Sequence, residues 1–64
     1  MKVSIKAIKE LAKLVSSEDI EFIDITEDKV DDKPVMIAVA TYADFRGDTW
    51  ERRHLLTEKG IVEL

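Results

Sequence analysis

The chain has 64 residues, no cysteine and one histidine, so disulfide bonds and thiolate metal sites are excluded. A chain of this length forms one domain, whose core rarely contributes more than about 3–5 kcal/mol of stability. The net charge of −4 conceals an acidic block, since residues 18–32 hold eight carboxylates and one lysine. Self-association is the remaining way for so small a core to gain stability.

No segment approaches the roughly 20 consecutive apolar residues that span a membrane. Lysines are spread through residues 1–15, where a signal peptide would have an apolar stretch. The sequence therefore predicts a cytoplasmic protein, of a cell or of a virus, with no membrane partner.

Residues 4–15 are predicted to form a helix, with Ser4 as the N-cap. Its apolar residues recur at three- and four-residue spacing and predict one face toward the core. They are Ile5, Ile8, Leu11, Ala12 and Val15. The lysines of this segment lie on another side, so a core-covering helix is expected.

Residues 20–26 are rich in β-branched side chains and partly alternate, which favours a strand. Ile23 and Ile25 are expected to face the core, whereas Phe22 points the other way. The charged segment that follows, residues 27–34, is expected to be a turn region.

Three further strands are predicted at residues 35–44, 48–57 and 61–64. They are separated by two three-residue loops, which end in Gly47 and Gly60, because glycine adopts the left-handed conformation that such loops require. The predicted fold class is α+β: one N-terminal helix on a three- to four-stranded antiparallel meander, in two layers.

The first of these hairpins has a predicted register, because a loop at residues 45–47 places Asp44 opposite Asp48. Counting back pairs Tyr42 with Trp50, Ala40 with Arg52, Ala38 with His54, and Met36 with Leu56, all on one face of the sheet. The same count across the second loop adds Val62 and Leu64 to this face. The other face carries Val35, Ile37, Val39 and Leu55, and we expect the helix to cover it.

One helix cannot cover both faces, so the face with Tyr42 and Trp50 is expected to be left for a partner. The candidate binding residues are Met36, Tyr42, Arg46, Trp50, Arg52, Arg53, His54 and Leu56. One interpretation is a homodimer, sheet against sheet, in which Arg52 pairs with a carboxylate of the partner's acidic block. The other is a groove in which the aromatic rings stack on a planar ligand and the basic residues meet phosphate or carboxylate.

No glycine-rich phosphate loop, metal-ligand cluster or nucleophile with a base at a recognisable spacing is present, so we expect neither an enzyme nor a cofactor. The acidic block either imitates a row of phosphates or keeps an edge strand from aggregating. The expectation is a small self-associating binding protein, plausible as an accessory protein of a phage or mobile element that inhibits or titrates a host protein. The alternative is a nucleotide- or nucleic-acid-binding module.

Overall fold

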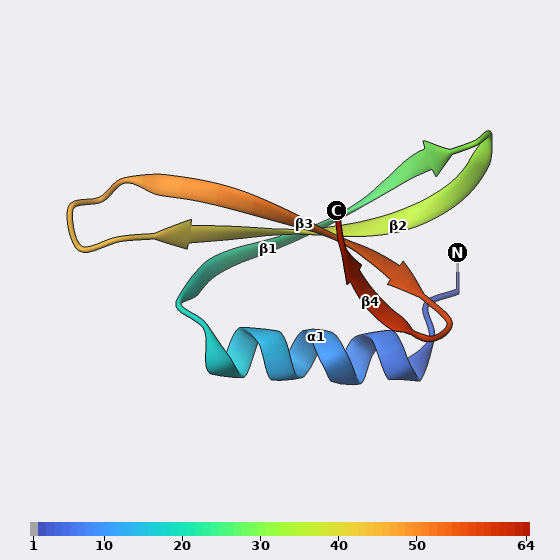
Figure 1. The fold of residues 1–64 in the computed structure, drawn as a ribbon, viewed down its shortest axis with the longest axis horizontal. Helices are drawn as coiled ribbons and strands as arrows, with labels where there is room; N and C mark the ends of the chain where they lie inside the picture. Colours follow the sequence, from blue (N-terminus) through green and yellow to red (C-terminus); the bar gives the residue numbers. More distant parts are fainter. Residues whose placement is uncertain (1) are drawn as a thin grey trace.

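The structure is a computed structural model that describes residues 2–64. Its elements are α1 (Ile5–Ser17), β1 (Ile20–Val30), β2 (Lys33–Ala43), β3 (Thr49–Thr57) and β4 (Gly60–Glu63). The four strands form one antiparallel sheet in the order β1-β2-β3-β4. Figure 1 shows α1 running along one side of this sheet as a second layer. The predicted α+β meander is therefore confirmed.

Both ends of α1 are defined by hydrogen bonds. Ser4 is the N-cap, and its Oγ accepts a hydrogen bond from the Ala7 N–H at 3.0 Å. The same hydroxyl donates to the Thr57 carbonyl at 2.7 Å, which ties the start of the helix to the end of β3. At the other end the Glu18 N–H bonds the Leu14 carbonyl at 3.1 Å, and the chain then turns toward β1.

The face of α1 that packs on the sheet differs from the predicted one. The residues turned toward the sheet are Ala7, which is fully buried, and the half-buried Glu10, Leu11 and Leu14. Ile5, Ile8 and Val15 remain exposed. Polar anchors set this rotation, because the Glu10 Oε1 accepts the Ile61 N–H at 2.8 Å and turns that flank of the helix toward β4.

The β1–β2 hairpin is longer than predicted. β1 continues to Val30, and only Asp31 and Asp32 form the turn, both with positive φ (51° and 64°). Two successive residues at positive φ are typical of a type I′ turn, whose twist matches the flanking strands. Pro34 lies within β2, where it is tolerated because β3 pairs with β2 only as far as Met36.

The predicted β2–β3 register is confirmed in full. Tyr42 opposes Trp50, and the other three predicted pairs are also present. The Asp44 N–H donates to the Asp48 carbonyl at 2.9 Å, which closes the three-residue loop. Gly47 has φ +86°, the left-handed conformation expected of the last loop residue.

The β3–β4 register differs from the prediction by one residue. The loop has two residues, because Thr57 pairs with Gly60, and Leu56 therefore opposes Ile61. Ile61 and Glu63, instead of Val62 and Leu64, join the face of His54. Gly60 belongs to the strand because it lies against the helix, where a Cβ would collide with the Glu10 carboxylate.

The prediction of which face the helix covers is wrong. Tyr42 is only 5 % exposed, His54 is 4 % exposed, and Ala38 and Ala40 between them are fully buried. Met36 and Leu56 on the same face are half-buried. Glu10 of α1 bonds Ile61 on this face, and the Tyr42 hydroxyl bonds Glu18 at the end of α1, so α1 covers this face.

The opposite face is protected at its centre without a helix. Ile37 is 2 % exposed there. Arg53 opposes Val39 on one side of β2, and Asp28 opposes Val35 on the other. Their ion pair, 3.2 Å between Arg53 Nη2 and Asp28 Oδ2, therefore crosses β2 at the position of Ile37. The aliphatic stem of arginine can shield an apolar neighbour while its charged end stays in water.

Within residues 2–64, α1 is too short and too polar to cross a membrane.

Candidate functional site

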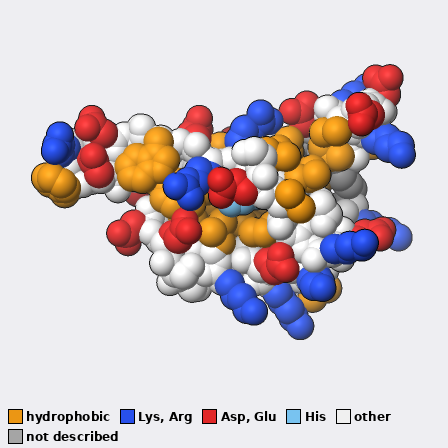
Figure 2. Space-filling view, in the orientation of Figure 1, with side chains coloured by type: hydrophobic (Ala, Val, Ile, Leu, Met, Phe, Trp, Pro, Cys, Tyr) orange, Lys and Arg blue, Asp and Glu red, His pale blue; other side chains and the backbone are white. Residues whose placement is uncertain are grey.

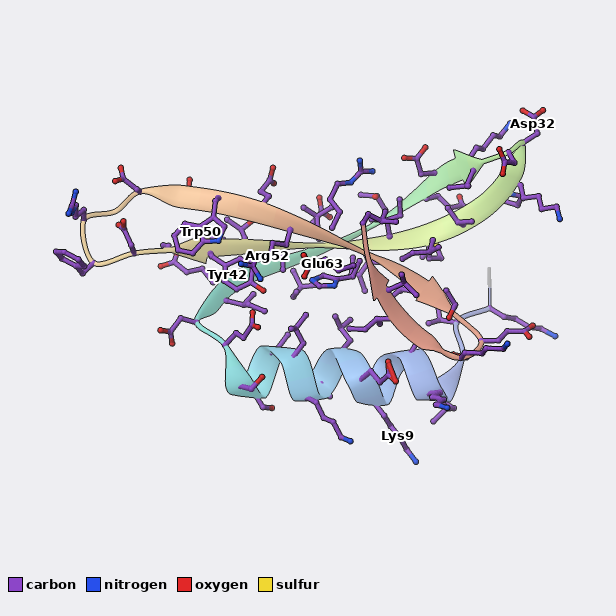
Figure 3. All side chains as sticks on the ribbon, viewed as in Figure 1. Lys9, Asp32, Tyr42, Trp50, Arg52 and Glu63 are labelled. Carbon is purple, nitrogen blue, oxygen red and sulfur yellow. The ribbon has the colours of Figure 1, made fainter. Side chains whose placement is uncertain are left out.

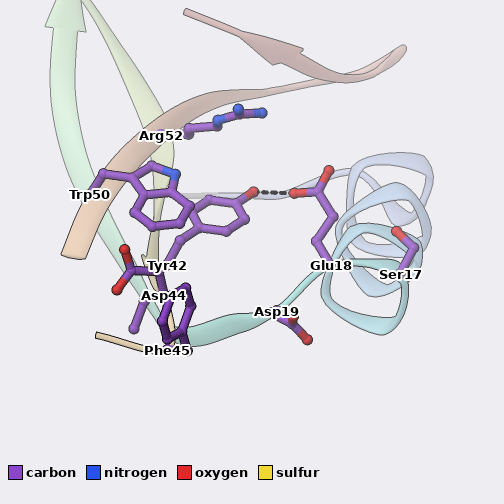
Figure 4. Close-up of a pocket in the computed structure, with 9 residues that line it drawn as sticks. Ser17, Glu18, Asp19, Tyr42, Asp44, Phe45, Trp50 and Arg52 are labelled. Carbon is purple, nitrogen blue, oxygen red and sulfur yellow. Dashed lines mark hydrogen bonds between the residues drawn. The ribbon is translucent and has the colours of Figure 1, made fainter. Parts of the chain in front are cut away.

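A groove of about 660 Å³ lies where the C-terminal end of α1 approaches the β2–β3 hairpin (Figure 4). We call it the aromatic–acidic groove. It is lined by Ser17, Glu18, Asp19, Tyr42, Ala43, Asp44, Phe45, Trp50 and Arg52. Figure 2 shows hydrophobic, acidic and basic side chains interspersed over this end of the molecule.

The aromatic part of the groove is a stacked pair. Tyr42 and Trp50 oppose each other on β2 and β3, with ring centroids 5.5 Å apart and planes inclined by 6°. Tyr42 is buried, whereas Trp50 is 43 % exposed and presents aromatic surface to solvent. Phe45, at the start of the hairpin loop, is almost fully exposed. Two accessible aromatic side chains therefore border one groove.

Three carboxylates border the same groove. Glu18, which caps the end of α1, accepts a hydrogen bond from the Tyr42 hydroxyl (Figure 4), and Asp19 follows it in the chain. Asp44 Oδ1 accepts the N–H groups of Arg46 at 2.8 Å and Asp48 at 3.0 Å. These two bonds hold the Asp44 carboxylate in place before any ligand binds.

Arg52 is the cation that lines the groove, and its charge is already partly compensated. Its guanidinium lies 5.5 Å from the centroid of the Tyr42 ring, and its Nη1 lies 3.9 Å from Glu63 Oε1. Figure 3 shows these side chains together on one side of the sheet. With three carboxylates and one arginine, the groove is net negative and favours a positively charged group.

The pKa of Tyr42 is raised to about 12, first because the side chain is desolvated and then because Glu18 accepts a hydrogen bond from its hydroxyl and carries a negative charge nearby. The hydroxyl therefore stays neutral at physiological pH. It acts as a fixed donor that orients Glu18, and not as a base.

The structure brings only some of the predicted site residues together. Tyr42, Trp50 and Arg52 line the groove. Arg46 lies over the Phe45 ring at 5.4 Å, at the tip of the hairpin. Arg53 points to the opposite face, where it pairs with Asp28.

The other predicted site residues lie beneath the helix. His54 is buried, and its Nε2 has no hydrogen-bond partner within the part of the chain that the structure describes. Met36 and Leu56 oppose each other, half-buried, farther along the same face. These three side chains contribute to the layer between α1 and the sheet and are not accessible in the groove.

Six lining residues were missing from the predicted site: Ser17, Glu18, Asp19, Ala43, Asp44 and Phe45. Asp44 and Phe45 could have been found, since they directly follow the Tyr42 strand and enter the loop that leads to Trp50. Glu18 and Asp19 could not, because their place depends on which sheet face α1 covers.

Among residues 2–64, no group of three or more histidine, cysteine, aspartate or glutamate side chains is arranged to hold a metal ion. Comparisons with protein-family profiles, with curated proteins and with solved structures found no match to this chain.

Proposed function

We propose that the protein is a binding protein whose aromatic–acidic groove receives an arginine side chain from a basic segment of a partner protein. The observation that carries this proposal is the combination of three carboxylates with two exposed aromatic side chains in one groove. By binding such a segment, the protein would inhibit or titrate its partner.

Arginine fits this arrangement better than other cations do. Its guanidinium is planar and weakly hydrated, stacks on aromatic rings, and forms bidentate pairs with carboxylates. Tryptophan offers the strongest cation–π interaction, about 0.5–1 kcal/mol at an exposed site. Trp50 supplies the ring, and Asp19 and Asp44 supply carboxylates on the same groove.

A nucleotide is less well supported by the charges of the groove. A base could stack on Trp50, but its phosphate would meet Glu18, Asp19 and Asp44. Arg52, the group that would attract phosphate, lies near Glu63 and over the Tyr42 ring. Nucleotide or nucleic-acid binding is therefore the alternative that the following experiment also tests.

The proposal is tested with a capped peptide that carries one arginine and with the same peptide carrying citrulline, which has the same shape and no charge. Trp50 is the only tryptophan of the chain, so its fluorescence reports on the groove. We expect the arginine peptide to change this fluorescence with saturation, and the citrulline peptide to bind at least several-fold more weakly. A short single-stranded oligonucleotide serves as the third ligand.

Asp19→Asn should weaken binding of the arginine peptide about twofold to fivefold, because an exposed ion pair contributes about 0.2–1 kcal/mol. Asp32→Asn is the matched control: it makes the same charge change at the turn of the β1–β2 hairpin, at the other end of the molecule (Figure 3). Equal binding of the two peptides would refute the proposal. Tighter binding of the oligonucleotide would replace it with the nucleic-acid alternative.

A further inference from the structure

β1 is an edge strand with one neighbour, β2, and it is 11 residues long. The outer side of an edge strand carries backbone N–H and C=O groups that can pair with another strand. The opposite edge of the sheet, β4, is closer to the helix, since Glu10 accepts the Ile61 N–H there. The long free edge of the sheet is therefore β1.

Exposed apolar side chains lie beside this edge. Ile25 is 48 % exposed, although its β2 partner Ala38 is fully buried under α1. At about 100° per residue, Ile8 and Val15 lie about half a turn around the helix from Glu10. Because Glu10 faces β4, the flank with Ile8 and Val15 is turned away from β4. We call Ile8, Val15 and Ile25 the edge patch.

We propose that a second copy of this chain pairs with β1 in antiparallel orientation about a two-fold axis at Ile25, which joins two sheets into one. Residue 25 is the midpoint of Ile20–Val30, so this register pairs residues 22–28 in regular alternation, while Glu21 lies at a β-bulge between Ile20 and Phe22. An axis perpendicular to the sheet keeps both helices on the same side and brings the two edge patches together.

The charges of β1 favour this register. Glu21, the residue of the bulge, comes beside Lys29 of the second copy, twice by symmetry, and Ile25 opposes itself. Asp24 opposes Thr26, so no directly opposed pair joins two carboxylates. Pairs of opposite charge across strands stabilise a sheet, whereas opposed like charges destabilise it.

The neighbouring symmetric registers are disfavoured by the same rule. An axis at Asp24 opposes Asp24 to its own copy and brings Glu21 beside Glu27, and an axis at Thr26 opposes Asp24 to Asp28. An axis midway between two residues would oppose side chains that point to opposite faces, which the pleat of paired strands does not allow. The charges of β1 thus favour one register of pairing and disfavour the neighbouring registers. Unselective pairing of an exposed edge strand would lead to aggregation.

A charge swap tests both the self-association and its register, with the mass of the full chain measured by sedimentation equilibrium. We expect the wild type to dimerise, and Glu21→Lys and Lys29→Glu each to weaken the dimer roughly tenfold, since each brings like charges together twice. The double variant Glu21→Lys/Lys29→Glu keeps the net charge and restores opposite pairs, so its dimer should regain the wild-type affinity. Failure of this rescue, or a wild type that stays monomeric, would overturn the proposal.

A second pair of variants tests the centre of the interface. Ile25→Lys places two ammonium groups together at the axis and should abolish the dimer, while circular dichroism shows that the monomer remains folded. Val62→Lys makes the same change at another exposed residue, on β4 and on the opposite face of the sheet, and should leave the dimer intact. Equal loss in both variants would reject the β1 interface. None of these variants alters a groove residue, so a failure here leaves the arginine site standing.

Discussion

Tyr42 is the side chain that connects the C-terminal end of the helix to the sheet. Its ring stacks on Trp50 and lies beneath the Arg52 guanidinium, and its hydroxyl donates a hydrogen bond to Glu18 at the end of α1. One residue therefore supports the aromatic wall of the groove and positions one of its carboxylates. Because it is the only tyrosine of the chain, its titration can be followed without overlap from others.

We predict that tyrosinate absorbance gives a midpoint near pH 12 for the folded protein, because burial and Glu18 raise the pKa of Tyr42 from 10.0 to about 12. In Glu18→Gln the midpoint should fall but stay above 10, because burial, the larger cause, remains. Glu51→Gln, an exposed glutamate on β3, is the control and should leave the midpoint unchanged. A wild-type midpoint at 10 would contradict the bond to Glu18.

The same shift has a consequence for stability. The unfolded chain loses the tyrosine proton near pH 10, whereas the folded chain keeps it until about pH 12. The contribution of Tyr42 to stability is therefore complete below pH 10 and is lost as the pH rises toward 12. Denaturant titrations across this interval should show wild type losing more stability than Glu18→Gln.

At the scale of elements, contacts at its N-terminal half fix how α1 sits on the sheet. Ser4 donates to the Thr57 carbonyl, and Glu10 accepts the Ile61 N–H. Gly60, between these two strand residues, leaves the space that the Glu10 carboxylate occupies. The rotation of the helix is therefore set by polar bonds to the β3–β4 hairpin, and the apolar residues Ile5 and Ile8 are left exposed.

We predict that Gly60→Ala destabilises the protein about 0.5–1.5 kcal/mol more than Gly47→Ala, because only the first displaces the Glu10 carboxylate and weakens its hydrogen bond from the Ile61 N–H. Both glycines have positive φ, +127° and +86°, so both variants strain the backbone. A Cβ at Gly60 would meet the Glu10 carboxylate, whereas nothing lies within 4 Å of one at Gly47. Urea denaturation measures the difference, and equal losses would show that Glu10 does not pack against β4.

At the scale of the whole molecule, the two proposed surfaces combine. The groove lies at the Ile20 end of β1, because Ile20 opposes Tyr42. In the proposed dimer Ile20 comes beside Val30 of the second copy, so the two grooves are separated by ten residues along the strands, about 33 Å at 3.3 Å per residue. The dimer would therefore present two cation sites to one basic partner.

We predict that a peptide with two arginines joined by a flexible linker that spans this distance binds the wild type at least tenfold more tightly than the single-arginine peptide, through effective concentration. Ile25→Lys, which leaves the groove residues unchanged, should abolish this gain and keep the affinity for the single-arginine peptide. Isothermal titration calorimetry measures both. A gain that persists in the monomeric variant would show that the second arginine binds elsewhere on the same chain.

The predictions that held depend on local chemistry. The helix, the alternating strands and the Phe45–Gly47 loop follow from neighbouring residues, and the loop alone determines the register of Tyr42 against Trp50. The predictions that failed involve residues far apart in the chain. The β3–β4 register differs by one residue from the predicted one, and it places Gly60 beside Glu10, a contact across 50 positions of the sequence that no local pattern reveals.

The amino-acid sequence by itself therefore determined the fold class, the strand order and the stacked aromatic pair, since these depend on propensity, alternation and turn geometry. Only the tertiary structure decided which face of the sheet the helix covers. β2 is apolar on both sides, so hydrophobicity does not distinguish them. The helix is held on its face by the polar anchors Ser4 and Glu10, and the Arg53–Asp28 ion pair crosses the other face. That choice also placed Glu18 and Asp19 beside Trp50 and so formed the groove.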